Sequence, residues 1–323
     1  MRKIAMLTSG GDAPGMNAAI RAVTRTAIAA GIEVFGVRSG YQGLMEGEFI
    51  SLGSRDVAGI IERGGTILGT ARCPEFENDE GRRKGLTTLQ DKGIEALIVI
   101  GGNGSQTGAY LLSQLGFPVL GVASTLDNDL VGSDMSIGVD SAMNMALGAI
   151  DRIKTTASSH HRAFLVEVMG RDCGYLALMI GITGGAEVIS IPEAPFEPEA
   201  IAKEFRQAYE RGNQHAIAVI AEGVKHKAAD IAAYFNEHQK QIGFELCVTT
   251  LGYVQRGGSP SAFDRLLATR MGASAVKAFI HGKRGILIGL LNGEMSMTPL
   301  GEVAHLKKPV DLRLLELART LAQ

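Results

Sequence analysis

The sequence lacks tryptophan, has few aromatic residues and contains only three cysteines. Aromatic residues make up 5% of the chain, and Cys73, Cys173 and Cys247 show no C-x-x-C spacing. Three such cysteines cannot form a disulfide framework, which is typical of a reducing compartment. The amino terminus lacks the long apolar core of a signal peptide, and no apolar run could span a bilayer. We therefore expect a cytoplasmic protein without a membrane partner.

An excess of charge of one sign is also missing. The 323 residues include 32 Lys and Arg and 34 Asp and Glu, which gives a net charge of −2. A nucleic-acid-binding domain usually carries a clear basic excess, so we expect no nucleic-acid partner. The hydrophobic share of 46% and the 42 glycines describe a compact globular chain. Its length fits one large or two modest domains, and we expect two.

The G-x-x-x-x-G-K-[ST] motif of P-loop proteins is absent too. Apolar runs nevertheless lead into loops of small residues at Ser9–Asn17 and at Gly101–Ser105. Backbone N–H groups in such loops can close around phosphate. A tight turn between strand and helix is the alternative for a single loop of this kind.

The alternation of apolar runs and helical patterns predicts the fold class. Strand-like runs alternate with helices along the whole chain, which indicates parallel sheets covered by helices, an α/β fold. One helix is expected from about residue 18 to 30 and another at 57–63. The pattern restarts after Asp129, and glycine is dense at 132–138 and 252–258. We predict one domain of residues 1–138 plus about 255–305, and another of 139–254 plus about 306–323.

Two carboxylates follow the apolar run 118–123. Asp127 and Asp129 flank Asn128, and alternating positions point both carboxylates one way if the chain stays extended. One carboxylate could then accept a proton from a hydroxyl while the other helps to hold Mg²⁺. An Asx-turn that caps the next segment is the alternative.

Three arginines could contact phosphate. Arg72 and Arg171 could stabilise charge on a transferring phosphoryl group, although either taken alone could be a solvated surface residue. Arg256 lies in the glycine-rich loop Gln255–Pro260, as a phosphate-recognition residue would. The carboxylates, the glycine loops and the arginines together suggest phosphoryl transfer.

These motifs resemble those of a known family. The order and spacing are similar to those of bacterial ATP-dependent 6-phosphofructokinases at Thr8–Asn17, Gly101–Ser105, Thr125–Asp129, Glu167–Arg171 and Gln255–Pro260. The resemblance covers essentially the whole chain. It implies two Rossmann-like domains, one for ATP and one for sugar phosphate, and phosphorylation of fructose 6-phosphate to fructose 1,6-bisphosphate with MgATP, the committed step of glycolysis. It also implies a homotetramer with ADP or phosphoenolpyruvate as effector.

The resemblance further implies roles for individual residues. Asp127 would be the base that takes the proton of the sugar's 1-hydroxyl, and Thr125, Arg171 and Arg72 would contact the transferring group. The ATP site would contain Gly11, Arg72, Cys73, Gly102, Asn103, Gly104 and Ser105, with Mg²⁺ at Asp129 and Asn103. The fructose 6-phosphate site would contain Thr125, Asp127, Arg162, Met169, Gly170, Arg171, Glu222, Cys247, Tyr253 and Arg256. The effector site would contain Arg21, Arg25, Lys154, Glu187 and Arg211.

Several positions depart from the family's pattern. Asn103 stands where an aspartate associated with Mg²⁺ is usual, Cys247 replaces an arginine that reaches the sugar phosphate of a neighbouring subunit, and Tyr253 replaces a histidine. Ser54 and Asn213 stand where the effector site usually has basic residues. We therefore expect weaker binding of sugar phosphate, and an attenuated or altered response to effectors. The missing charge at Asn103 should lower the affinity for Mg²⁺; the alternative is that Asp129 and the phosphates of the nucleotide suffice to hold the ion.

The phosphoryl donor can also be inferred from the resemblance. Pyrophosphate-using members usually have aspartate where this chain has Gly104 and lysine where it has Ser124. An aspartate at 104 would crowd and repel the nucleotide, so the sequence favours ATP. The alternatives are pyrophosphate as donor, a different ketose phosphate as acceptor, or a regulatory paralogue with weakened catalysis.

Overall fold

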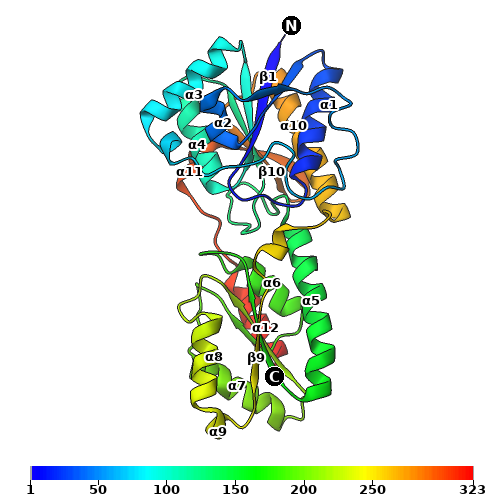
Figure 1. Cartoon of the computed structure of the whole chain (residues 1–323), viewed down its shortest axis with the longest axis vertical. Coiled ribbons are helices and arrows are strands. Elements are labelled where there is room, and N and C mark those ends of the chain that lie inside the picture. The colour runs from blue at the N-terminus through cyan, green and yellow to red at the C-terminus, as the bar shows by residue number, and fades with distance from the viewer. Residues whose placement is uncertain (1, 323) are drawn as a thin grey trace. The chain divides into compact units, whose positions relative to one another are not determined.

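The protein is described here by a computed structural model that covers residues 2–322. The chain forms two compact units (Figure 1). Unit 1 contains the chain up to Thr125, Leu130–Ser141 and Arg256–Lys308, and unit 2 contains Leu126–Asp129, Ala142–Gln255 and the chain from Pro309 onward. The segment Leu126–Asp129 therefore belongs to unit 2, whereas the sequence assigned it to the first domain.

Unit 1 is built on a seven-stranded sheet with the order β11-β10-β5-β4-β1-β2-β3. The strands β2, β1, β4, β5 and β10 pair in parallel, and the edge strands β3 and β11 pair antiparallel. All residues of β4 and β5 are buried, as expected for parallel strands covered on both faces. The strand bounds are β1 (Lys3–Ser9), β2 (Glu33–Val37), β3 (Phe49–Ser51), β4 (Ala96–Gly101), β5 (Val119–Ala123), β10 (Ile286–Leu291) and β11 (Glu294–Pro299).

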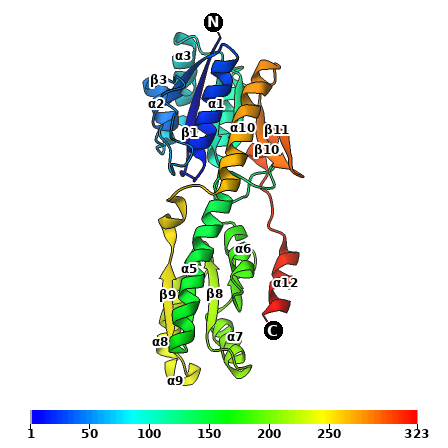
Figure 2. The same cartoon turned by 90° about the vertical axis from the view of Figure 1, so that its right-hand side faces the viewer.

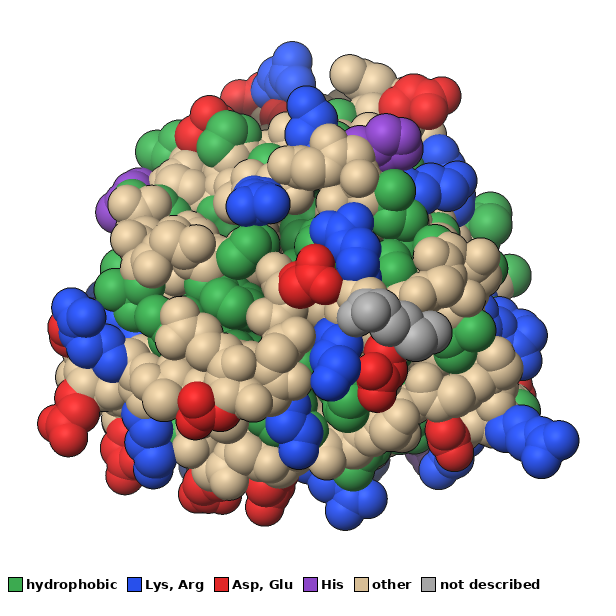
Figure 3. Space-filling view, turned by 90° about the horizontal axis from the view of Figure 1, so that it is seen from above, with side chains coloured by type: hydrophobic (Ala, Val, Ile, Leu, Met, Phe, Trp, Pro, Cys, Tyr) green, Lys and Arg blue, Asp and Glu red, His purple; other side chains and the backbone are tan. Residues whose placement is uncertain are grey.

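The helices of unit 1 pack in groups on this sheet. Helices α1 (Met16–Ala29) and α10 (Ala262–Ile280) lie side by side, as both Figure 1 and Figure 2 show. The other helices of the unit are α2 (Gly40–Glu46), the 3₁₀ helix η1 (Pro74–Glu77), α3 (Asp79–Asp91), α4 (Asn103–Gln114) and α11 (Leu300–His305). Of these, α2 packs on α3 and α4 packs on α11. Figure 3 views the molecule from above Figure 1, and on that face cationic and anionic side chains are interspersed.

The strand order fixes where ligands should bind in unit 1. From β1 the chain goes to β2 on one side, and β4 pairs with β1 on the other side. This reversal is a topological switch point, where the loops at the carboxyl ends of the strands diverge and open α/β sheets bind ligands. The loops after β1 and β4 flank this point.

Unit 2 contains a second parallel sheet, with four strands in the order β7-β8-β6-β9. Its strands are β6 (Ala163–Val168), β7 (Val188–Ser190), β8 (Ala216–Ala221) and β9 (Leu246–Thr250). Helices α7 and α8 pack together, as do α6 and α12. The helix bounds are α5 (Val139–His160), α6 (Tyr175–Thr183), α7 (Pro198–Glu210), α8 (Ala228–Glu237), α9 (Gln239–Ile242), α12 (Leu312–Leu321) and the 3₁₀ helix η2 (Gly252–Arg256). Within residues 2–322, no helix is both long and apolar enough to cross a membrane.

One predicted helix is wrong. The helix expected at 18–30 is confirmed as α1, but residues 57–63 form a series of turns. Val57 and Ile60 are buried, which produces the helix-like spacing of apolar residues. The Nδ2 of Asn17 donates to the carbonyl oxygens of Arg63 (3.0 Å) and Gly64 (3.1 Å), so these carbonyls bind a side chain instead of continuing a helix.

Candidate functional site

The segment Gly101–Ser105, here called the phosphate loop, connects β4 to α4. The N-cap of α4 is Gly102, and no side chain in the described part of the chain caps the helix there. The N–H groups of the first helical turn are therefore left for a ligand, and the helix dipole favours an anion at that position. Gly102, Asn103, Gly104 and Ser105, all predicted to contact ATP, lie at this helix start.

The loop after β1 lies beside the phosphate loop. A Cβ built at Gly10 would be 3.2 Å from Ser105 Oγ, so the two loops are in close contact. The Oγ1 of Thr70 donates to the carbonyl oxygen of Gly10 at 2.7 Å. This hydrogen bond holds the segment that contains Arg72 and Cys73 beside the loop after β1. Burial, with the charges of Glu75 and Glu46, raises the pKa of the Cys73 thiol, which is therefore a neutral group.

Arg256 approaches the loop after β1 from the carboxyl-terminal part of unit 1. Its Nη1 donates to the carbonyl oxygen of Asp12 at 2.8 Å. A Cβ at Gly11 would collide with its guanidinium group, so only glycine leaves room for this approach. The structure thus brings together Gly11, predicted for ATP, and Arg256, predicted for sugar phosphate.

Two further residues hold the phosphate loop. A Cβ built at Gly102 would lie 3.2 Å from the Cβ of Thr125, so the predicted catalytic threonine lies against the loop. The Oη of Tyr41 donates to the carbonyl oxygen of Ser105 at 2.6 Å, and its ring stacks on Phe76 at 4.1 Å. Burial strongly raises the pKa of Tyr41, so its hydroxyl remains a donor.

In unit 2, the loops after β6, β8 and β9 meet at the carboxyl ends of the strands. The Met169 N–H donates to Gln255 Oε1 at 2.7 Å, and the Arg171 N–H donates to Glu222 Oε1 at 3.2 Å. Arg171 has a left-handed backbone with φ of 48°. Four residues predicted for the sugar phosphate, Met169, Gly170, Arg171 and Glu222, are therefore neighbours.

The two predicted carboxylates belong to unit 2, but not in the extended arrangement that the sequence suggested. Asn128 has φ of 52°, a left-handed conformation that breaks the alternation between Asp127 and Asp129. The Oδ1 of Asp129 is buried and has no hydrogen-bond partner among residues 2–322. Burial and the charges of Asp129, Glu193 and Asp127 raise the pKa of Cys173 to about 11, which shows that both carboxylates lie near this thiol.

Comparisons with known proteins show the family of this chain. A family model described as phosphofructokinase matches residues 3–279. This chain belongs to the phosphofructokinase family. It is 52% identical over 324 residues to ATP-dependent 6-phosphofructokinase 1 of Thermus thermophilus and 47% identical over 322 residues to ATP-dependent 6-phosphofructokinase of Bacillus pumilus, with 100% of both chains covered in each case.

Solved structures of other phosphofructokinases show the same fold. The phosphofructokinase of Saccharomyces cerevisiae matches with a TM-score of 0.86 and 39% identity over 94% of this chain, which spans 45% of the yeast chain. A pyrophosphate-dependent phosphofructokinase from Marinobacter aquaeolei matches with a TM-score of 0.88, with 97% of this chain and 86% of that chain covered. At 24% identity, the second match supports the fold only.

Three residues predicted for the sugar-phosphate site, Arg162, Cys247 and Tyr253, lie in or near β9. Arg162 forms an ion pair with Glu245, with 3.0 Å between Nη2 and Oε2. Cys247 lies in β9, opposite Phe164 of β6, and is partly exposed. Tyr253 in η2 is 82% exposed. The side chain of Tyr253 can therefore contact a ligand or another protein chain.

The predicted effector residues are divided between the units. Arg21 and Arg25 lie on α1 of unit 1, and Lys154, Glu187 and Arg211 belong to unit 2. Glu187 and Arg211 line one cavity of about 490 Å³ together with Asn213. There, Asn213 Nδ2 donates to Glu187 Oε1 at 3.3 Å, and Arg211 Nη2 donates to the carbonyl oxygen of Ala322 at 2.8 Å.

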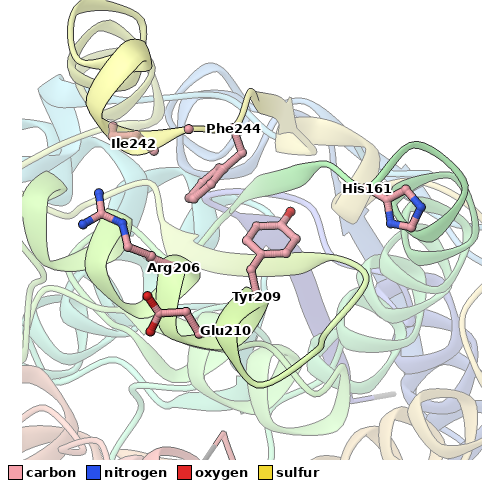
Figure 4. Close-up of a pocket in the computed structure, with 7 residues that line it drawn as sticks. His161, Arg206, Tyr209, Glu210, Ile242 and Phe244 are labelled. Atoms are coloured by element: carbon pink, nitrogen blue, oxygen red, sulfur yellow. The ribbon is translucent and has the colours of Figure 1, made fainter.

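Unit 2 also has a hollow that contains none of the predicted site residues. Its volume is about 470 Å³, and Figure 4 shows Tyr209 and Phe244 facing each other beside Arg206 and Glu210 of α7. The two rings pack at 5.0 Å. Burial raises the pKa of Tyr209 to about 12. Phe244 is far from Arg206, Tyr209 and Glu210 in the sequence, and none of these residues belongs to one of its motifs.

Three residues that support the site were missed from the sequence. Tyr41 and Gln106 contact the backbone around the phosphate loop, and Gln255 accepts a hydrogen bond from Met169. Gln106 directly follows the phosphate loop, and Gln255 directly precedes Arg256. Their position next to a motif is the sequence feature that could have indicated a supporting role. Tyr41 lies far away in sequence, and only the folded chain reveals its contact.

Proposed function

We propose that this phosphofructokinase transfers the γ-phosphoryl group of MgATP to the 1-hydroxyl of D-fructose 6-phosphate, which gives fructose 1,6-bisphosphate in glycolysis. Full-length identity of 47–52% to proteins named ATP-dependent 6-phosphofructokinase carries this proposal. The uncapped start of α4 supports it, because it suits the phosphates of a nucleotide. We further propose a cytoplasmic homotetramer.

In the proposed reaction, the chain mainly positions the reactants and supplies charge. Asp127 accepts the proton of the 1-hydroxyl while the oxygen bonds to the γ-phosphorus and the bond to the departing ADP breaks. Arg72 and Arg171 stabilise the negative charge of the phosphoryl group, and Thr125 hydrogen-bonds to it. Met169, Gly170, Glu222, Arg162 and Arg256 bind the sugar phosphate.

Asp129 fits the role of a Mg²⁺ ligand. Its buried Oδ1, unpartnered in the described part of the chain, is a hard oxygen of the kind that Mg²⁺ prefers. Mg²⁺ often takes only one or two carboxylates together with substrate phosphates, whose charge it neutralises. Among residues 2–322, no three His, Cys, Asp or Glu side chains are placed to hold a metal together. Asn103 would contribute its amide oxygen through a metal-bound water.

The geometry at Gly104 supports ATP as the donor. Among residues 2–322, a Cβ at this position would meet no atom within 4 Å apart from its chain neighbours and the backbone of its own helical turn. Internal packing therefore does not require glycine there, and the missing side chain leaves room for a nucleotide. A carboxylate in its place would repel the phosphates.

A crossed assay tests the proposed function. Purified protein is given ATP or pyrophosphate, each with fructose 6-phosphate or another ketose phosphate, in the presence of Mg²⁺. We expect turnover with ATP and fructose 6-phosphate and at most a trace with pyrophosphate. Faster turnover with pyrophosphate or another acceptor would change the assignment. Ligand binding without turnover in every combination would indicate a regulatory paralogue.

The asparagine at 103 predicts a raised Mg²⁺ requirement. Asn103→Asp adds a negative charge at the start of α4, and the Mg²⁺ concentration for half-maximal activity should fall about threefold to tenfold. Activity is measured against free Mg²⁺ at saturating substrates. Asn236→Asp, on the exposed surface of α8, is the control for added charge. An unchanged Mg²⁺ requirement in Asn103→Asp would reject the role of this position.

The cysteine at 247 predicts weak affinity for the sugar phosphate. Cys247→Arg restores a charge-assisted contact to phosphate, roughly 1.5–3 kcal/mol, so KM for fructose 6-phosphate should fall about tenfold to a hundredfold. Cys247→Ser keeps the size without adding charge and should leave KM unchanged. Equal KM values in both variants would show that other residues of the pocket compensate for the missing positive charge at position 247.

The effector cavity predicts an attenuated response. Asn213 is neutral, and Arg211 already donates to the end of α12. ADP and phosphoenolpyruvate should therefore each shift half-saturation by fructose 6-phosphate by about twofold or less, and Asn213→Lys should enlarge the shift. The measurement is a sugar-phosphate titration at several effector concentrations. Strong activation and inhibition of the unmodified chain would refute attenuation.

A further inference from the structure

Gln106 places one amide group over the junction of β4 and β5. The residue lies in the first turns of α4 and is fully buried. Its Nε2 lies 3.0 Å from the carbonyl oxygen of Gly101, 3.2 Å from that of Val99 and 3.3 Å from that of Val122. The first two belong to β4 and the third to β5, so one donor group connects the carboxyl ends of both strands.

These strand ends lead into the two segments that the proposed reaction needs. Gly101 begins the phosphate loop, and Val122 precedes Ser124 and Thr125 by a few residues. Thr125 contacts the loop near Gly102. The amide of Gln106 therefore acts on the spacing between the residues predicted for the nucleotide and a threonine predicted for the transferring group.

The orientation of the amide follows from its neighbours. If Oε1 and Nε2 were exchanged, an acceptor would face three other acceptors, which would repel it. In the orientation found, Oε1 is buried and has no partner among residues 2–322. An orphaned acceptor is unfavourable, so the three contacts of Nε2 must be what retains the amide.

A glycine on the neighbouring strand makes room for this amide. A Cβ at Gly121, in the middle of buried β5, would collide with Oε1 of Gln106. Glycine weakens the interior of a strand and often marks a close approach of this kind. The glycine at 121 and the unpartnered Oε1 of Gln106 are both unfavourable, and both belong to this arrangement. An apolar residue such as leucine or methionine at position 106 would leave no unpartnered oxygen.

We propose that Gln106 is a positioning residue for phosphoryl transfer, which fixes the phosphate loop relative to Ser124–Thr125. The inference rests on the proposed function. Gln106 acts through the backbone carbonyls of β4 and β5, and Tyr41 supports the other end of the loop through the carbonyl oxygen of Ser105. Loss of the amide donor should therefore impair catalysis more than folding.

The first test compares Gln106→Met with the unmodified enzyme. Methionine has a similar volume and removes both the donor and the orphaned acceptor, so Tm should stay within a few degrees. The kcat should fall about tenfold to a hundredfold, as expected for a small misplacement of reacting groups, while KM for fructose 6-phosphate changes less than about threefold. Gln114→Met, exposed at the end of α4, is the control. An unchanged kcat, or a loss of activity that only follows a lowered Tm, would overturn the proposal.

The second test uses protonation. In Gln106→Glu the carboxylate repels the three carbonyls, whereas the protonated acid can donate to one of them, and burial raises its pKa. The kcat of this variant relative to the unmodified enzyme should rise as the pH falls from about 8 to 6. A ratio independent of pH would overturn the proposal. If the unmodified enzyme itself fails to turn over MgATP and fructose 6-phosphate, the proposed function fails instead.

Discussion

Asp127→Ser should lower kcat by about a hundredfold to ten-thousandfold, because it removes the proposed base for the 1-hydroxyl. Asp127 is half-buried in the segment Leu126–Asp129 of unit 2. Its charge is one of the causes that raise the pKa of Cys173. Serine is small and polar, so the sugar-phosphate site should persist and the dissociation constant for fructose 6-phosphate should change less than about threefold. The measurements are steady-state turnover and equilibrium binding.

A second aspartate serves as the control for this substitution. Asp151 is exposed on α5, and Asp151→Ser should have the turnover of the unmodified enzyme. If Asp127→Ser retained more than about a tenth of the turnover, another group would have to accept the proton. A large loss of sugar-phosphate affinity would instead make Asp127 a binding residue.

Gly223→Ala should lower kcat/KM for fructose 6-phosphate about a hundredfold, through displacement of the loop that carries Arg171. A Cβ at Gly223 would collide with the carbonyl oxygen of Arg171 and lie 2.6 Å from its carbonyl carbon. Both partners are backbone atoms, so one loop must move, and the hydrogen bond between the Arg171 N–H and Glu222 would be disturbed. Kinetics with fructose 6-phosphate as the varied substrate measure the effect.

The control for Gly223→Ala is Gly148→Ala in α5. There a Cβ would meet only the flexible end of Arg152, at 3.3 Å, and alanine favours the helix. Nucleotide binding to Gly223→Ala shows whether the loss is confined to the sugar phosphate, and circular dichroism reports folding. Wild-type kcat/KM in Gly223→Ala would show that the Arg171 loop does not set sugar-phosphate affinity.

The sequence predicted the framework around the phosphate loop well. The buried strands β4 and β5 were visible because parallel strands covered on both faces read as continuous apolar runs. The phosphate loop between β4 and α4 was visible through its glycines. These signals are local, since each depends on residues that are adjacent in the chain.

What the sequence could not provide depends on distant contacts. The turns at 57–63 are fixed by Asn17, and the left-handed Asn128 breaks the expected alternation of Asp127 and Asp129. The role of Gln106 depends on Gly121, fifteen positions along the chain and on another element. No pattern of neighbouring residues indicates such a contact.

Identification of the reaction products tests whether this chain phosphorylates fructose 6-phosphate at carbon 1 with MgATP. The purified chain is incubated with MgATP and fructose 6-phosphate, and the phosphates are followed by ³¹P NMR. We expect equal amounts of ADP and fructose 1,6-bisphosphate, with a new phosphate monoester at carbon 1, and no such signal from Asp127→Ser in the same time. Consumption of ATP without formation of the bisphosphate would contradict this assignment. So would formation of the bisphosphate only in a parallel incubation in which pyrophosphate replaces ATP.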